Sequence, residues 1–208
     1  MTQATKRSDY RVTAARLTAA LVLLLLPARV LAHTGEEVAA GLLSGFLHPL
    51  TGIDHLLAMV AVGIWGTQLG RPAIWLLPLT FPLVMSMGGV LGVRGVPLPA
   101  VEFGVAGSAA ALGLMILLVA RPPIAVAAIL VGAFAIFHGH AHGTELPGAA
   151  DPLAYGAGFV LVTGLLHAAG IAIGLVDRWP AGALALRGAG AVIGAVGIYL
   201  LLGLTGLV

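Results

Sequence analysis

The residues best suited to chemistry stand at the end of an apolar stretch, in the segment AFAIFHGHAHGTELPG. In a helix, His138, His142 and Glu145 are spaced i, i+4 and i+7, which places them along one stripe. His140 points to another side of such a helix and is the weakest candidate of the three histidines. Two imidazoles and a carboxylate on one stripe predict a site for a divalent metal ion. The alternative is a polar helix end at the level of the lipid headgroups.

The same residue types recur in the segment HPLTGIDH, which contains His48, Asp54 and His55. Pro49 suits the first position of a helix, because proline has no N–H to leave unpaired there. A helix through both histidines, which are seven residues apart, would place them on one face two turns apart. Asp54 could bind the ion itself or orient the neighbouring imidazole. The alternative is a capped helix start whose polar residues lie at the membrane interface.

Three single residues extend the candidate set. Glu102 opens a later apolar stretch, and His167 lies about fourteen residues, or about 21 Å, into another. Ionisable residues within a membrane span are costly and usually functional, although a lone histidine can also be a satisfied packing residue. If a signal peptide were cleaved after Ala32, His33 would become the first residue, and its α-amine and imidazole could chelate a metal. N-terminal sequencing would check this start.

The absence of cysteine limits the chemistry of any metal site in this chain. Disulfides and thiolate ligands are excluded, which leaves histidine, carboxylates and methionine as ligands. Imidazole and carboxylate ligands suit Ni²⁺, Co²⁺, Zn²⁺ or Cu²⁺, and spacing alone does not rank these ions. The methionines are scattered and fit the core better than a copper site. We expect no prosthetic group.

The composition predicts an all-α polytopic membrane protein. The hydrophobic fraction is 60%, the charged fraction is 9% and the mean hydropathy is +1.08, far from the values of a soluble domain. Six apolar stretches each have about the 20 residues that cross a hydrocarbon core, and breaks with turn and charge signals separate them. The stretches are residues 52–70, 73–93, 101–120, 123–141, 153–176 and 183–206. A further segment, 36–47, is too short to span and is expected at the interface or dipping into the membrane before Pro49.

The first 32 residues have the features of a cleavable signal peptide. A basic region is followed by the ten-residue apolar core 17–26 and by the small residues of a cleavage site. The alternative is an uncleaved first transmembrane helix. Without residues 1–32 the chain keeps five basic and seven acidic side chains, so its formal charge changes from +2 to −2. The basic character belongs to the targeting segment and indicates no nucleic-acid partner. The predicted domains are residues 1–32, the signal peptide, and residues 33–208, one six-helix bundle in the plasma (inner) membrane.

Two independent signals predict the orientation of this bundle. A cleaved signal peptide places the mature N-terminus outside, so that the breaks between spans alternate, starting inside. The predicted inner breaks carry Arg71, Arg121, Arg178 and Arg187, and the outer breaks carry Arg94, Glu145 and Asp151. This distribution follows the positive-inside rule. Both histidine segments and Glu102 would then lie at the outer face.

Pairs of glycines four residues apart predict close helix packing. They are Gly88 and Gly92, Gly170 and Gly174, and Gly190 and Gly194. Packing within one bundle is the favoured interpretation, and a homo-oligomer stays open.

The two histidine segments resemble the motifs of the HupE/UreJ family. HPLTGIDH is similar to its His-x5-Asp-His motif, and FHGHAHGTE to its Phe-His-Gly-x-Ala-His-Gly-x-Glu motif. His140 falls on the variable position of the second motif, and Glu102 and His167 are similar to polar positions in the family's third and fifth spans. The resemblance covers essentially the whole chain. It implies a permease for nickel, or in some members cobalt, that often serves hydrogenase or urease maturation.

The functional hypothesis is uptake of a divalent metal through an outer-facing site. His48, Asp54, His55, His138, His142 and Glu145 would capture the ion, with Glu102 adjacent and His167 as an inner relay. The rival hypothesis is an intramembrane zinc-dependent hydrolase, which Ser86 or Ser108 could assist, although no His-Glu-x-x-His pattern is present. A third interpretation, a metal sensor or metallochaperone-like partner, lacks the soluble domain or long tail that would support it.

Overall fold

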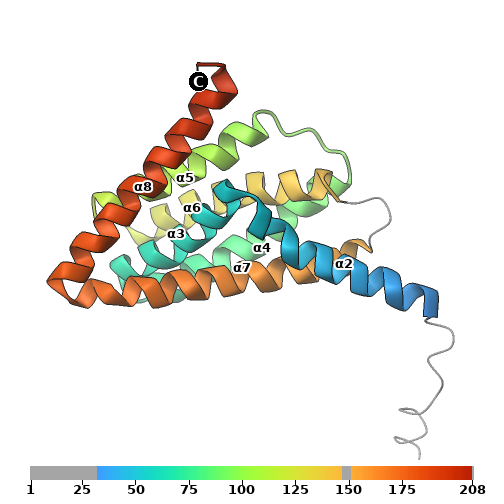
Figure 1. The fold of residues 1–208 in the computed structure, drawn as a ribbon, viewed down its shortest axis with the longest axis horizontal. Coiled ribbons are helices and arrows are strands. Elements are labelled where there is room, and N and C mark those ends of the chain that lie inside the picture. Colours follow the sequence, from blue (N-terminus) through green and yellow to red (C-terminus); the bar gives the residue numbers. More distant parts are fainter. Residues whose placement is uncertain (1–31, 147–150, 208) are drawn as a thin grey trace, which may run out of the picture. The chain divides into compact units, whose positions relative to one another are not determined.

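Every regular element in the described part of the chain is a helix (Figure 1). The structure is a computed structural model, and it describes residues 32–146 and 151–207, with side chains from Val38 onward. The helices are α2 (Ala32–Thr51), α3 (Ile53–Leu69), α4 (Ala73–Val93), α5 (Val101–Leu117), α6 (Ile124–Thr144), α7 (Pro152–Gly174), the 3-10 helix η2 (Leu175–Arg178) and α8 (Pro180–Thr205). The predicted signal peptide lies outside the described residues, apart from Ala32.

The apolar stretches predicted from the sequence become helices α3 to α8. Four of the described elements have the length and apolar composition of a membrane span: α4, α6, α7 with η2, and α8. The bent pair of α2 and α3 would make a fifth span if its two arms cross as one. Helix α5 is apolar, but its 17 residues are short for a crossing. A multi-pass membrane protein follows from these lengths, and the count of six spans stays a prediction.

The expectation that one helix carries both His48 and His55 was wrong. Pro49 lies inside the last turn of α2 rather than at a helix start. Gly52 interrupts the helix with an extended backbone conformation, and α2 and α3 meet there at 85°. The two histidines therefore belong to different helices, and any contact between them and a common ion depends on tertiary packing.

Close contacts between glycines pack the helices in pairs. A Cβ atom on these glycines would overlap the facing helix, at its backbone or, for Gly174, at the side chain of Thr67, so the pairs rely on the absence of side chains. The contacts join Gly88 and Gly92 of α4 to α6, Gly170 and Gly174 of α7 to α3, and Gly190 of α8 to α5. The predicted glycine pairs thus serve packing within the chain, as the sequence favoured. Gly45 of α2 faces the backbone of Tyr155 in the same way, which sets α2 against the start of α7.

Side chains from two neighbouring helices donate to carbonyl groups at the end of α5 and just after it. Carbonyls at the end of a helix lack the partners that its interior supplies. The hydrogen bonds run from Trp65 Nε1 to Ala120 O (2.9 Å), from Gln68 Nε2 to Ile116 O (3.3 Å) and from Arg187 Nε to Leu117 O (3.0 Å). Helix α5 is thereby held against α3 and α8 at the end opposite the histidine segments.

Candidate metal centre

Three imidazoles from two helices converge on one point. His55 stands in the first turn of α3, and His138 and His142 stand one turn apart near the end of α6. The Nδ1 atom of His55 lies 2.7 Å from His138 Nδ1 and 2.9 Å from His142 Nε2. An ion bound at about 2.0–2.1 Å from each nitrogen would hold these atoms about 3.0–3.4 Å apart. A small outward movement of the rings would therefore let this group of three histidines bind a metal.

The glycines between the histidines explain why α6 presents them inward. Gly139 and Gly143 alternate with the histidines and face α4, where a Cβ on Gly139 would overlap the carbonyl oxygen of Met85. This close approach fixes the rotation of α6 on α4. The stripe of His138 and His142 is consequently turned toward α3 rather than toward lipid.

A second, more exposed group of ligands adjoins the first. His48 Nε2 lies 3.0 Å from Glu145 Oε2, and the same carboxylate oxygen lies 3.7 Å from His142 Nδ1. His48 and Glu145 are 33% and 51% exposed in their side chains, whereas His142 is only 5% exposed. His142 belongs to both groups, because its Nε2 faces His55 and its Nδ1 faces Glu145. The exposed pair, His48 and Glu145, and the three converging histidines therefore form a continuous series of ligands.

Ser108 of α5 orients His138, although from the sequence we assigned Ser108 only a minor role in the hydrolase alternative. The hydroxyl donates its proton to the carbonyl of Val105 at 2.6 Å, so it accepts a hydrogen bond from His138 Nε2 at 2.8 Å. A neutral His138 with its proton on Nε2 has an unprotonated Nδ1, and this atom faces His55. The hydroxyl thus holds His138 in the tautomer that a metal needs.

We expect Ser108→Ala to weaken metal binding by about 10–100-fold, as losses of such orienting hydrogen bonds do. The measurement is titration of the purified protein with Ni²⁺. The control is Ser44→Ala, because the Ser44 hydroxyl bonds only to the backbone of its own helix, at Gly41 O. Equal affinities of the Ser108 variant and the wild type would contradict the orienting role.

Asp54 and Glu102 lie at the same end of the helices but outside the two groups. Asp54 Oδ1 accepts the backbone N–H of His55 at 2.8 Å and lies 3.9 Å from His55 Nε2, so it acts on His55 through charge and local structure. Glu102 stands in the first turn of α5 with an exposed side chain. Among the described residues it forms no hydrogen bond or ion pair.

Of the remaining histidines, His140 and His167 occupy different environments. His140 turns away from the cluster and donates from Nε2 to the carbonyl of Val96 at 2.7 Å, in agreement with its predicted position on another side of the helix. His167 lies deeper, on α7, and its side chain is buried. His33 falls among the side chains that the structure does not describe.

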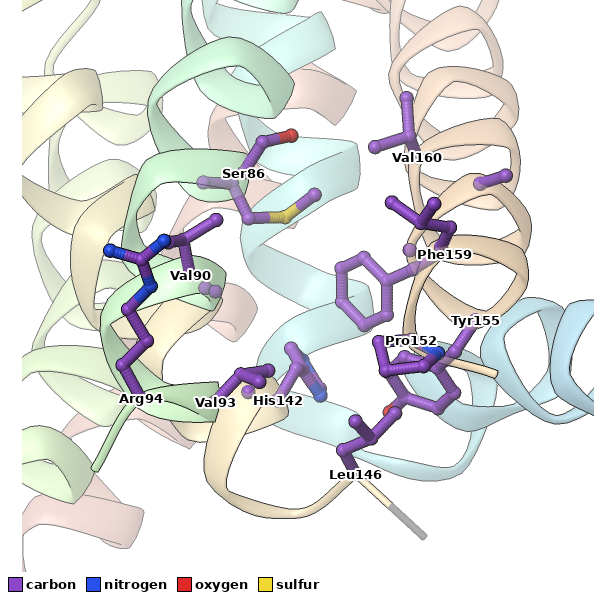
Figure 2. A pocket seen from close by; sticks show the side chains of 17 residues that line it. Ser86, Val90, Val93, Arg94, His142, Leu146, Pro152, Tyr155, Phe159 and Val160 are labelled. Carbon is purple, nitrogen blue, oxygen red and sulfur yellow. The ribbon is translucent and has the colours of Figure 1, made fainter. Parts of the chain in front are cut away.

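A cavity of about 600 Å³ borders the cluster on the side of α4 and α7. Figure 2 shows the imidazole of His142 at this cavity, close to the aromatic side chains of Phe159 and Tyr155. The rings of His142 and Phe159 are 4.1 Å apart between centroids. His142 is therefore the member of the cluster that lines this cavity, whereas His138 is completely buried. Neither aromatic residue is recognisable from the sequence, because residues on the apolar α7 carry no sign of their partner.

Two comparisons with known proteins extend over most of this chain. The family model described as HupE / UreJ protein matches residues 21–200. The chain is 44% identical over 188 residues to Protein HupE of Rhizobium leguminosarum bv. viciae, which covers 90% of this chain and 98% of the relative. No solved structure gives a significant match. With the family model and the curated relative both extending over most of its length, the chain belongs to the HupE/UreJ family.

Proposed function

We propose that this protein is a permease that takes up a divalent transition-metal ion across the plasma membrane. The observation that carries the proposal is the convergence of His55, His138 and His142 within an apolar helical protein. Nickel is the ion that we propose first and cobalt second, since imidazole-rich sites without thiolates suit both. The same ligand chemistry also suits copper(II) and zinc, so it does not exclude them.

The two ligand groups support a route with two stages. His48 and Glu145 are the exposed ligands, so they would meet the hydrated ion first. Each ligand that replaces a water reduces the cost of moving the ion toward His142, which contacts both groups. His138, which is completely buried, and His55 would then complete the inner ligand set. We place this site at the outer face, with the mature N-terminus, because of the arginine distribution.

The membrane potential is a sufficient energy source for this uptake. One charge that crosses 100 mV gains about 2.3 kcal/mol, so a divalent ion gains about 4.6 kcal/mol. At about 1.4 kcal/mol per tenfold change, this supports roughly thousandfold accumulation. Exchange of protons through the histidines is the alternative energy source.

The environment of Ser108 disfavours the hydrolase alternative. A serine nucleophile needs a base that accepts its proton and a path for the substrate. The Ser108 hydroxyl instead donates to the carbonyl of Val105 and is completely buried. We therefore propose transport and no enzymatic activity.

We also propose how the chain is processed and which enzymes use the imported ion. Residues 1–32 would be removed as a signal peptide, and residues 33–208 would form the transport domain. If cleavage follows Ala32, His33 would add a ligand at the outer face. The imported ion would supply nickel enzymes such as hydrogenase or urease indirectly.

The test is the total cellular content of nickel, cobalt, copper and zinc, measured by elemental analysis. Cells that express the wild type are compared with cells that express His138→Ala at equal membrane abundance, with metals at trace concentrations. We expect one metal to rise in the wild type and not in the variant, which would establish transport and identify the ion together. Equal contents of all four metals would contradict transport and favour zinc-dependent turnover of a lipid or peptide.

A further inference from the structure

Pro82 in α4 leaves the backbone carbonyl of Pro78 free inside the protein. In an α-helix the carbonyl of residue 78 accepts a hydrogen bond from the N–H of residue 82. Residue 82 is Pro82, which has no N–H, so the carbonyl of Pro78 lacks its helical partner. The imidazole of His167, from α7, occupies this position, and its Nδ1 lies 3.2 Å from Pro78 O.

This hydrogen bond determines which nitrogen of His167 can bind a metal. A carbonyl oxygen only accepts, so Nδ1 carries the proton and donates it. The Nε2 atom of the neutral ring then has a free lone pair. Among the described residues it has no hydrogen-bond partner, although the side chain is 1% exposed. A histidine that donates one ring N–H to a backbone carbonyl and offers the other nitrogen is the usual arrangement of a metal ligand.

The Phe81 ring contacts both His167 and the histidine cluster. Its centroid lies 5.3 Å from the ring of His138 and 5.3 Å from the ring of His167, in edge-to-face arrangements. Phe81 is completely buried. Both nitrogens of His138 are already engaged, by His55 and Ser108. Of the two imidazoles that the Phe81 ring contacts, His167 therefore has the nitrogen without a partner among the described residues, its Nε2, and the ring itself offers no ligand atom.

On the basis of the proposed function, we propose that Phe81 is the barrier between the histidine cluster and an inner binding position at His167 Nε2. A phenyl ring has no lone pair to replace the water or imidazole ligands that a divalent ion gives up, so passage requires the ring to turn aside. His167 Nε2 then binds the ion. Pro82 keeps this nitrogen oriented indirectly, because it leaves the Pro78 carbonyl free to accept the hydrogen bond from His167 Nδ1.

Variants of Phe81 separate a barrier from a binding residue. The purified full-length protein is reconstituted into liposomes, and Ni²⁺ entry is followed with a divalent-ion indicator inside at an imposed membrane potential. Equilibrium Ni²⁺ binding is measured in parallel. We expect Phe81→Leu to raise the entry rate and Phe81→Trp to lower it, each with the affinity of the outer site unchanged. If both variants admit Ni²⁺ at the wild-type rate, or if their Ni²⁺ affinity changes in parallel with the entry rate, Phe81 is not a barrier.

A second set of variants tests the orientation of His167. Pro82→Ala restores an N–H that competes for the Pro78 carbonyl, so we expect Ni²⁺ entry to fall about 10–100-fold, as after loss of other orienting hydrogen bonds. The double variant Pro82→Ala/His167→Ala should be no slower than His167→Ala alone. The control is Leu83→Ala, an exposed neighbour on the same helix.

The outcomes distinguish this inference from the proposed function. Wild-type liposomes that admit no Ni²⁺, Co²⁺, Cu²⁺ or Zn²⁺ would contradict transport itself. If the wild type admits Ni²⁺ and both Pro82→Ala and His167→Ala admit it at the same rate, only the inner binding position is contradicted. If the effects of Pro82→Ala and His167→Ala on the Ni²⁺ entry rate add fully in the double variant, Pro82 does not act through His167.

Discussion

Replacement of His142 by alanine is expected to abolish metal accumulation while the protein remains in the membrane. His142 is the residue shared by the two ligand groups, because Nε2 lies 2.9 Å from His55 Nδ1 and Nδ1 lies 3.7 Å from Glu145 Oε2. Its loss removes a ligand from the capture stage and from the enclosed stage together. We expect accumulation to fall by more than the roughly 10–100-fold that loss of an orienting neighbour costs. Cellular metal content at equal membrane abundance is the measurement.

The matched control for this experiment is His140→Ala, on the same helix. His140 is buried to a similar degree, but it donates to the carbonyl of Val96 and lies outside both ligand groups. We expect this variant to keep most of the accumulation and to lose only stability at the loop after α4. Normal accumulation in the His142 variant would exclude the proposed route. A His140 variant as inactive as the His142 variant would attribute the loss to folding of the segment rather than to metal binding.

Replacement of Gly139 by alanine is expected to destabilise the protein strongly, although it adds one methyl group. The added Cβ would overlap the carbonyl oxygen of Met85 on α4, and a backbone atom cannot move aside as a flexible side chain can. Overpacking of this kind costs about 1–3 kcal/mol and occasionally more. The same displacement would rotate His138 and His142 away from His55. We expect less monomeric protein in detergent, a lower apparent Tm and weaker Ni²⁺ binding.

Gly164→Ala on α7 is the control for the added methyl group. A Cβ at Gly164 meets no atom within 4 Å, so the change is sterically free. Alanine favours a helix over glycine by up to about 1 kcal/mol, so stability should stay equal or rise slightly. Equal apparent Tm values of the two variants would contradict the close contact between α4 and α6.

Local features of the chain were sufficient to predict helices α3 to α8 and the stripe on α6, but not the extent of α2. Apolar composition and the glycine, proline and charged breaks are encoded within each segment, and the predicted stretch 73–93 coincides with α4 (Ala73–Val93). The spacing of His138, His142 and Glu145 depends only on the helical repeat. It correctly predicted that His142 and Glu145 approach each other and that His140 points elsewhere.

The composition of the candidate metal centre was decided by tertiary structure. The sequence near Gly52 did not predict the bend of 85° that places His48 and His55 on different helices. The contacts of Ser108 with His138 and of His167 with Pro78 join residues 30 and 89 positions apart. Such contacts depend on the rotation and depth at which helices pack, and these are set by glycine contacts spread over several helices rather than by any single segment. The sequence by itself determined which residue types could bind a metal, and the packing of α3, α6 and α7 determined which of their nitrogens meet.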